Sequence, residues 1–463
     1  MNSFLNIIPF LGIASLVSCS FGPDYSEPQM DMPQVFRKSS NMTESIADLS
    51  WKRVIPNTDL QNLLSDTMKH NYDARTLLIN IDTAGLQIRK SSAPLFPWLG
   101  YSGSATRADN SSGSMITDMP SGSVSSSGSA ALTASWELDL WGKVRKGKEA
   151  AIASYHAEEE AYRAMILSLF KEVATGYLQL IKLDEQLSIA KQAVISYQDS
   201  QKMFVVKFDQ GMGSRLQIES ANAALVAAQA DVADLSMQIQ ELETTLSALA
   251  GRMPGSIKRS ASLDQYVNNN PIPAGIPAQI LARRPDIRQK AYQLRQANAE
   301  IGVAIANYFP SVSLTGNGGF AGNELLSSSH SKFGWNFGAN LTGPIFQGGQ
   351  LSADKKIAEN NYRQAVLGYE QTVTNAMSSI TKVLIRRQEL KNIITSQQVA
   401  VESYKNALKL AMTRYKSGLS NYYEVLTAQQ NLFPAQTKLA QYKYQYVSCV
   451  PTLYAELGGG WKQ

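Results

Sequence analysis

The chain has 463 residues, a length that allows two to four ordinary domains. Charged residues make up only 17% of it and the formal net charge is +5, a balance that does not indicate a nucleic-acid-binding protein. A mean hydropathy of −0.19 excludes a polytopic helical membrane protein. The three histidines and two cysteines are not clustered in the sequence, so we expect neither a metal site nor another cofactor.

The N-terminus carries a short apolar segment, FLNIIPFLGIASLV, which begins at Phe4 and is followed by Ser18 and Cys19. This arrangement is typical of a signal peptide, expected at residues 1–18, rather than of a core helix. The sequence LVSC resembles a bacterial lipobox, which implies cleavage before Cys19 and acylation of its thiol. An ordinary signal peptide or a buried strand is the alternative. Residues 19–56 are then expected to form a lipidated, extended tail.

Two segments are helical in pattern and end at a proline. One covers residues 51–90, with a break expected near residues 56–58, and the other covers residues 280–310. The prolines that close these segments, Pro97 and Pro310, are 213 residues apart. A period of that length indicates two copies of one half-protein rather than a solenoid.

After each proline the hydrophobic period changes to two. Strands are expected at about residues 98–108, 129–141, 311–320 and 333–343, as two hairpins. The clearest of them have one apolar face and one small, polar face, which is the pattern of strands that cross an outer membrane. The aromatic residues expected at the membrane interface are Trp98, Trp136, Trp141, Phe333 and Trp335.

Four strands cannot close into a barrel, and the hydrocarbon of a membrane does not tolerate the unpaired backbone groups of a sheet edge. The chain is therefore expected to oligomerise so that its sheet closes. The alternative is a soluble four-stranded sheet with one wet face. We disfavour it because the large aromatic residues would have no long element to cover them.

Each hairpin is followed by a long helix, a glycine-bearing turn and an antiparallel partner helix. These helices are expected at residues 143–208 and 215–250 in the first copy, and at residues 350–416 and 421–457 in the second. About 65 residues at 1.5 Å per residue give roughly 100 Å of helix. Gly142 and Gly211 match Gly349 and Gly418 at an offset of 207, whereas Leu249-Ala250-Gly251 matches Leu457-Gly458-Gly459 at 208.

The chain thus divides into a first repeat at residues 57–251, a linker at residues 252–277 and a second repeat at residues 278–463. The fold class is mainly α with a part that belongs to a β-barrel. Four basic residues open the first long helix, where positive charge opposes the helix dipole: Lys143, Arg145, Lys146 and Lys148. They need lipid headgroups or a neighbouring protomer's carboxylates as partners, unless they are a plain solvated cluster.

Several motifs follow one another in a specific order. After GPDYSEP, which follows Cys19, they are ELDLWGKVR, LARRPDIRQ, IGVAIANYFP, GPIFQGG and RYKSGLSNYYEVLTAQQNL. Together they resemble the outer membrane factor family, and in particular the lipoprotein subgroup that serves tripartite resistance-nodulation-division efflux pumps. The resemblance covers the whole mature chain.

The resemblance implies a homotrimer in the outer membrane, in which each protomer gives four strands to a shared twelve-stranded transmembrane β-barrel. The long antiparallel helices would form an α-barrel across the periplasm. The implied partners are a periplasmic adaptor protein, an inner-membrane transporter and outer membrane lipid, with no nucleic acid. The implied function is a passive exit duct for drugs or other small toxic molecules. The alternatives are the channel of a type I protein secretion system and a coiled-coil periplasmic lipoprotein that does not span the membrane.

Two groups of residues near the helix turns are the candidate functional sites. A periplasmic gate is expected at Asp209, Arg414, Tyr415 and Lys416, since charged and aromatic side chains on converging helices can hold a constriction shut. The alternative is that they are solvated turn residues. Contact with the adaptor is expected at the turns, namely at Gly211, Met212, Gly213, Gly418, Leu419 and Ser420. No nucleotide-binding loop or catalytic constellation is present in the sequence, so an enzyme is not expected.

Overall fold

The computed structural model describes residues 21–34, 36, 45–109, 124–267, 275, 279–322 and 331–459. The expected signal peptide and Cys19 lie outside the described residues. The chain forms two compact units, which we describe separately. The sheet unit consists of Met1–Gln29, Asn80–Glu158 and Gln289–Tyr369, and the helical unit consists of Met30–Ile79, Glu159–Arg288 and Glu370–Gln463.

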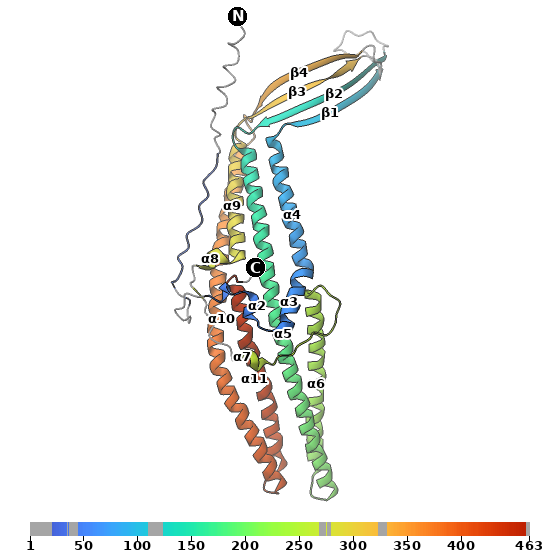
Figure 1. Cartoon of the computed structure of the whole chain (residues 1–463), viewed down its shortest axis with the longest axis vertical. Coiled ribbons are helices and arrows are strands. Elements are labelled where there is room, and N and C mark those ends of the chain that lie inside the picture. Colours follow the sequence, from blue (N-terminus) through green and yellow to red (C-terminus); the bar gives the residue numbers. More distant parts are fainter. Residues whose placement is uncertain are drawn as a thin grey trace. The chain divides into compact units, whose positions relative to one another are not determined.

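The first copy begins with short helices (Figure 1). They are η1 (Ile46–Asp48), α2 (Trp51–Val54), α3 (Thr58–His70), α4 (Tyr72–Ser92) and η2 (Ala93–Leu95). The expected break near residues 56–58 is present, and a second break that we did not expect lies at Asn71. There the Asn71 side chain accepts a hydrogen bond from the Ala74 amide at 3.0 Å, so that it caps a new helix.

Four long helices follow the two hairpins in the chain. They are α5 (Lys143–Asp209) and α6 (Arg215–Leu249) in the first copy, and α10 (Gln350–Lys416) and α11 (Tyr422–Glu456) in the second. The linker holds α7 (Leu263–Val267), and the second copy opens with α8 (Gln279–Arg283) and α9 (Pro285–Ala306). Every bound of the long helices keeps an offset of 207 residues between the copies.

The offset of 208 expected at the last helix ends is therefore wrong. Gly251 matches Gly458, and both have a left-handed backbone, with φ of +66° and +75°. In both copies the next amide bonds back to the helix, from Arg252 to the Ser247 carbonyl and from Gly459 to the Tyr454 carbonyl. This is the Schellman ending, which requires the glycine at one position and so fixes the alignment.

The four strands form one antiparallel sheet in the order β1-β2-β3-β4. Their bounds are β1 (Trp98–Asp109), β2 (Val124–Leu138), β3 (Ser311–Gly322) and β4 (Ser331–Thr342). β2 thus begins five residues before the expected start at 129 and ends before the expected end at 141. It ends early because Asp139 turns back to cap α5, accepting hydrogen bonds from the amides of Val144 and Arg145, each at 2.9 Å.

The core of the helical unit lies where α3, α5 and α11 pack together. Its largest fully buried side chains include Leu60, Leu64, Phe170, Tyr177 and Tyr454. The rings of Phe170 and Tyr454 are 5.1 Å apart between centroids. The apolar stripes of the three helices are thereby removed from water, which is the main stabilising contribution to such a unit.

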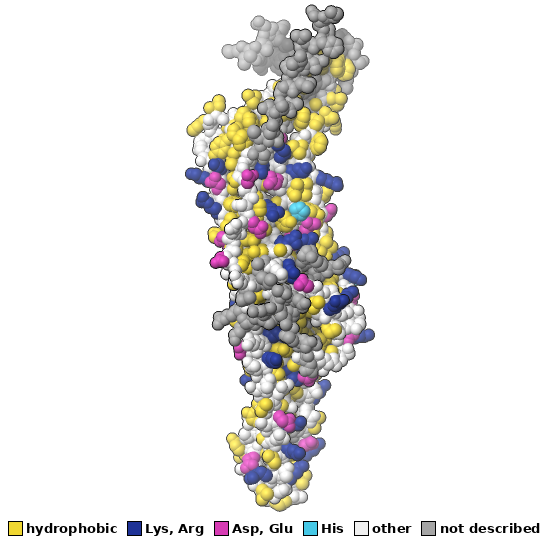
Figure 2. All heavy atoms as spheres, turned by 60° about the vertical axis from the view of Figure 1, so that its left-hand side comes forward, with side chains coloured by type: hydrophobic (Ala, Val, Ile, Leu, Met, Phe, Trp, Pro, Cys, Tyr) yellow, Lys and Arg dark blue, Asp and Glu magenta, His cyan; other side chains and the backbone are white. Residues whose placement is uncertain are grey.

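Charged residues of the linker fasten it across both copies inside the helical unit. Arg259 binds Asp184 on α5 and Glu243 on α6. Asp264 on α7 binds the buried Lys443 of α11, with Nζ and Oδ1 at 2.7 Å. The segment between the repeats is therefore bound by ion pairs to helices of both copies. Figure 2 shows positive and negative side chains interspersed over the helices on the face that it presents.

Candidate functional site

One face of the sheet is a continuous apolar surface. The registers place Leu132 opposite Tyr101 and Gly318, and Gly318 opposite Trp335, so the alternation continues across all four strands. The exposed apolar side chains that share this face are Leu99, Tyr101, Leu132, Trp136, Phe320, Phe333, Trp335, Phe337 and Leu341. A soluble sheet would bury such a face, whereas a sheet in lipid exposes it.

The opposite face of the sheet is polar. The Ser104 and Ser129 hydroxyls are 2.9 Å apart, and the Asn340 amide donates to the Thr315 hydroxyl at 3.2 Å. Trp98 pairs with Ser135 and lies over Gly100, so it belongs to this polar face. Trp98 was predicted to lie at the membrane interface, and its side chain lies on the polar face of the sheet rather than on the apolar face that carries Trp136, Phe333 and Trp335.

Trp141 also differs from its expected position. It follows β2 in a turn, stacks on Phe309 with ring centroids 4.9 Å apart, and donates from Nε1 to the Pro310 carbonyl at 2.6 Å. Phe309 stacks in turn on Phe21, at 4.6 Å. This aromatic stack fixes the joint between the ends of the strands and the helices of the sheet unit.

The basic residues at the start of α5 have a local partner. Asp139 caps the helix, and its carboxylate pairs with the Arg145 guanidinium at 3.1 Å. Lys146 pairs with Glu149 at 2.8 Å. A carboxylate at a helix N-terminus compensates the dipole, so this part of the cluster needs neither lipid nor a second protomer.

The N-terminal tail is fixed along α9 within the sheet unit. The Asn298 amide donates to the Pro23 carbonyl at 2.9 Å, and the Arg295 guanidinium lies 4.9 Å from the centre of the Tyr25 ring. Gly302 provides the close approach, since a Cβ there would lie 2.8 Å from the Phe21 carbonyl oxygen. The tail is therefore held against α9 from Phe21 to Tyr25.

The two turns between the long helices have the same geometry. Gly211 and Gly418 have φ of +74° and +73°. The amides that follow them bond back to the helix, from Met212 to the Lys207 carbonyl and from Leu419 to the Arg414 carbonyl, each at 2.9 Å. The glycines are required for the left-handed conformation of this helix ending.

The turns and the first residues after them present large apolar side chains to solvent. Met212 is 70% exposed, Leu419 71%, Leu216 75% and Tyr423 73%. Exposed apolar residues that cluster at one place mark an interaction site, because isolated soluble proteins keep such patches small.

The structure separates the four expected gate residues. Asp209, Arg414 and Lys416 are exposed, and the Arg414 guanidinium lies 3.8 Å from the Glu424 carboxylate in its own hairpin. Tyr415 is only 5% exposed. Tyr415 is therefore a packing residue within the single chain. The burial of its side chain does not support the expectation that it faces a constriction.

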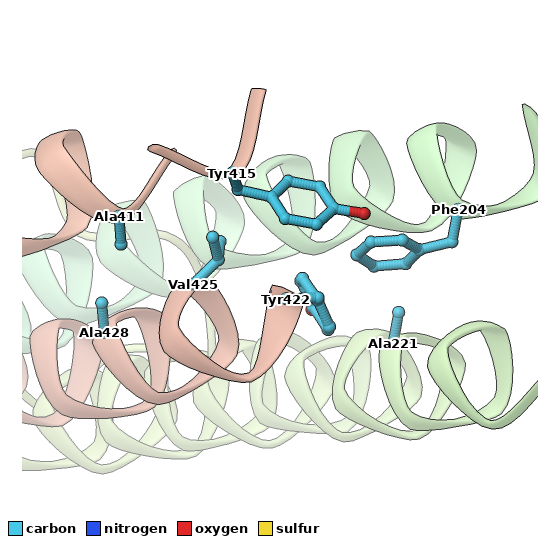
Figure 3. Close-up of a cluster of buried hydrophobic side chains, with 7 residues drawn as sticks. All are labelled: Phe204, Ala221, Ala411, Tyr415, Tyr422, Val425 and Ala428. Carbon is cyan, nitrogen blue, oxygen red and sulfur yellow. The ribbon is translucent and has the colours of Figure 1, made fainter. Parts of the chain in front are cut away.

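Tyr415 belongs to a cluster that joins the two helical hairpins (Figure 3). The Phe204 ring lies 3.9 Å from the Tyr422 ring and 6.0 Å from the Tyr415 ring, measured between centroids. The ammonium group of Lys207 lies 4.0 Å from the centre of the Tyr415 ring, a cation–π contact between the hairpins. Neither Phe204 nor Lys207 was predicted from the sequence, although Lys207 precedes Arg414 by the repeat offset of 207.

A buried polar contact also joins the hairpins. Gln429 on α11 is 1% exposed, and its amide nitrogen lies 2.8 Å from the Ser196 hydroxyl and 3.2 Å from the Ser200 hydroxyl on α5. A buried amide nitrogen that finds its partners on a neighbouring helix favours the alignment in which these hydrogen bonds form. The aromatic cluster and Gln429 therefore hold the two hairpins of one protomer in a defined register.

Two buried ionisable groups have structural rather than chemical roles. Glu160 is 1% exposed, and burial raises the pKa of its carboxyl, although Arg288 and Arg163 pair with it. Burial also raises the pKa of the Cys449 thiol, to about 11. Cys449 is therefore an inert core residue. Among the described residues, no three His, Cys, Asp or Glu side chains form a group that would hold a metal ion.

These features define a class of protein. The chain combines two long helical hairpins with an open sheet whose apolar face is exposed, as in an outer membrane channel subunit. The family model described as "Outer membrane efflux protein" matches residues 63–252 and 276–459. The chain belongs to the outer membrane efflux protein family, as the sequence motifs predicted.

Individual relatives agree with the family. The chain is 32% identical to the cation efflux system protein CusC of Escherichia coli O6:H1, over 99% of both chains. It is 29% identical to the probable outer membrane lipoprotein SilC of Salmonella typhimurium, again over 99% of both. A crystal structure of CusC matches with a TM-score of 0.84 and 30% identity, covering 96% of this chain and 100% of that one. The predicted fold, efflux function and outer membrane location are confirmed.

Proposed function

We propose that this chain is one subunit of a homotrimeric exit duct. Three copies would each contribute four strands to a twelve-stranded barrel, with the long helices forming an α-barrel in the periplasm. The observation that carries the proposal is the sheet itself, which is apolar and exposed on one face, polar on the other, and has β1 and β4 as edges. The backbone groups of these edges would have no hydrogen-bond partners in lipid, so the sheet must close by pairing with further copies of the chain.

The duct is passive and has no catalytic role. Energy for export comes from an inner-membrane transporter, reached through a periplasmic adaptor protein. The relatives named above include a cation efflux system protein, which favours export of small toxic species over secretion of proteins. The polar face of the sheet, with Ser104, Ser129, Thr315 and Asn340, would line the exit.

The adaptor docks at the two turns between the long helices. Support comes from the exposed side chains of Met212 and Leu419, which offer apolar area beside the backbone of Gly211, Gly213, Gly418 and Ser420. The gate would use the exposed charges of Asp209, Arg414 and Lys416 around the trimer axis. Tyr415 would act on that gate indirectly, by packing one hairpin against the other.

Acylation of Cys19 adds a lipid anchor. The tail is fixed at Phe21, whose ring stacks on Phe309 next to the end of the strands. An anchor two residues earlier would therefore emerge at the level where the strands leave the membrane. Trp136, Phe333 and Trp335 would then face lipid on the apolar side of the sheet.

Four experiments test the proposal. Light scattering in detergent should give the mass of a trimer, and circular dichroism should give both helix and strand signals. Deletion of the gene should raise susceptibility to toxic small molecules, and wild-type protein should restore export. Photo-crosslinkers at Met212 and Leu419 should capture an adaptor, whereas one at the exposed Ile393 of α10 should not. A monomer in detergent, or unchanged export after deletion, would refute the function.

A further inference from the structure

A cavity of about 330 Å³ lies in the sheet unit, where β2, β3 and β4 join the helices. This volume is within the range of small-molecule binding sites. Trp141 and Phe309 supply aromatic walls, and the side chains of Asn307, Ser311 and Thr342 line the cavity with polar groups. The duct and its adaptor contacts make no use of this cavity.

Two of the three charged residues that line the cavity have no partner. Asp139 is occupied, because its carboxylate caps α5 and pairs with the Arg145 guanidinium at 3.1 Å. Glu137 and Lys143 are both exposed. Neither side chain has a hydrogen bond or an ion pair with another residue that the structure describes. The cavity therefore offers one carboxylate, which only accepts hydrogen bonds, and one ammonium group, which only donates them.

A ligand must carry both charges to pair with both groups. A cation bound to Glu137 alone would leave Lys143 unpaired at the start of α5, where the helix dipole opposes its positive charge. An anion bound to Lys143 alone would leave the Glu137 carboxylate unpaired in the same cavity. A zwitterion forms charge-assisted hydrogen bonds with both side chains, and these are stronger than bonds between neutral groups.

Apolar side chains continue from the cavity onto the lipid-facing side of the sheet. Leu138 lines the cavity and belongs to the apolar face, since it follows Trp136 by two residues on β2. Leu341 lies on the same face beside the lining residue Thr342 and is 71% exposed. A ligand with its charged group in the cavity thus has an apolar path along this face for hydrocarbon chains.

The residues that follow β4 indicate that this end of the sheet is in contact with lipid. Ile345 and Phe346 come directly after the lining residue Pro344, and they are 103% and 88% exposed. Exposed apolar side chains beside a polar cavity match the boundary between the hydrocarbon of a membrane and its headgroups. The ligand that meets both environments at once is a membrane lipid.

We propose that this cavity binds the zwitterionic headgroup of a phospholipid of the phosphoethanolamine type from the periplasmic leaflet. The headgroup ammonium donates to the Glu137 carboxylate, and the headgroup phosphate pairs with the Lys143 ammonium. The acyl chains lie along Leu138 and Leu341. This inference goes beyond the proposed duct, since it requires only the outer membrane location and not a trimer.

Native mass spectrometry of the full-length protein in detergent tests the headgroup. Phosphatidylethanolamine, phosphatidylcholine and phosphatidylglycerol are compared with identical acyl chains. The choline lipid is also a zwitterion but has no N–H to donate to Glu137, and the glycerol lipid has a phosphate but no cation. We expect phosphatidylethanolamine to bind about tenfold more tightly than either, which is the effect of one hydrogen bond to a charged group. Equal binding of the three lipids would overturn the proposal.

Variants of the two charged residues locate the binding. Glu137→Gln should reduce the affinity for phosphatidylethanolamine to that for phosphatidylcholine, whereas Lys143→Met should weaken both, because both carry the phosphate. The matched controls are Glu172→Gln and Lys148→Met, at residues of α5 that do not line the cavity. Circular dichroism should show that all four variants fold as wild type does. Controls that lose as much affinity as the cavity variants would refute this site.

Soluble phosphoethanolamine distinguishes a lipid from a free solute of the same chemistry. We expect it to compete with the lipid only weakly, because it lacks the chains that contact Leu138 and Leu341. Competition at the concentration at which the lipid itself binds would overturn the assignment to a lipid. Light scattering separates this failure from a failure of the proposed function. A trimer without lipid preference refutes only this inference, whereas a monomer that still prefers phosphatidylethanolamine refutes only the proposed duct.

Discussion

Arg284 donates to the last carbonyl of α11, that of Glu456, at 2.5 Å, and to the Glu456 carboxylate at 2.9 Å. The first copy has the same joint in simpler form, since the Asn71 amide donates to the last carbonyl of α6, that of Leu249, at 3.0 Å. In both copies, a side chain at the start of one helix thus donates a hydrogen bond to the last carbonyl of a long helix. Arg284 of the LARRPDIRQ motif is thus part of this joint, whereas the neighbouring Arg283 pairs with Asp48 at 2.8 Å.

Removal of the Arg284 guanidinium should be strongly destabilising. Arg284 and Glu456 are 12% and 14% exposed, so Arg284→Met leaves a buried carboxylate without its main partner. We expect the free energy of unfolding to fall by about 3 kcal/mol. The matched control is Lys405→Met, whose pair with Glu402 spans 4.0 Å between largely exposed side chains and should cost at most about 1 kcal/mol. Denaturant titrations followed by helix signal measure both, and equal losses would contradict the prediction.

The same joint should weaken in acid. Burial alone would raise the pKa of the Glu456 carboxyl. Hydrogen bonds from Ser379 and Arg284 and the charges of Arg284 and Lys171 outweigh this effect and lower the pKa below the ordinary 4.5. A lowered carboxyl pKa stabilises the fold above the ordinary value, and this stabilisation is lost as pH falls through the folded pKa. Glu456→Gln should therefore be less stable than wild type at neutral pH, and the difference should shrink below the ordinary pKa. A difference that is constant with pH would show that the charge plays no part.

The sequence predicts the long helices and the glycine turns well because both have local causes. The uninterrupted helical pattern of α5 and α10 and the left-handed glycines at 211 and 418 depend on neighbouring residues alone. The face of Trp98 was missed because it depends on how β1 aligns with β2. That alignment depends on the first hairpin loop, whose serine- and glycine-rich sequence does not specify a turn.

The burial of Tyr415 was missed for a related reason. Its neighbours Phe204 and Tyr422 lie on other helices, and only the packing of the two hairpins brings the three rings together. The joint at Arg284 could not be predicted from a local pattern, because its partner Glu456 is distant in sequence. Contacts between segments that are distant in sequence can be identified only from the tertiary structure. The offset of 207 residues between the copies, in contrast, can be recognised in the sequence.

Substitution by alanine should reduce stability by different amounts at Gly251 and Gly211, although the two glycines have similar backbone conformations. Gly251 has φ of +66° and a Cβ there would lie 2.3 Å from the His70 carbonyl, whereas Gly211 has φ of +74° and nothing within 4 Å of that position. Gly211→Ala should cost about 1–2 kcal/mol, the strain of a left-handed alanine. Gly251→Ala adds a backbone clash and should cost clearly more. Thermal unfolding of both variants measures this, and an equal loss would show that the backbone at Gly251 relaxes freely.

Truncation of Tyr415 should loosen the packing between the hairpins. Tyr415→Ala removes a buried ring from the cluster with Phe204 and Tyr422, and such a change costs about 3 kcal/mol. We expect faster hydrogen exchange and faster proteolysis at both turns. Tyr423→Ala is the control, because Tyr423 is 73% exposed and its loss should change neither rate.

The hydroxyl group distinguishes packing from a direct role in gating. Tyr415→Phe keeps the ring and its contact with the Lys207 ammonium, so it should leave exchange at the turns and the conductance of the reconstituted channel as in wild type. If the Tyr415 hydroxyl itself closed the channel, Tyr415→Phe would raise conductance as much as Tyr415→Ala. We expect an increase only in the alanine variant, because the closed alignment depends on the packed ring.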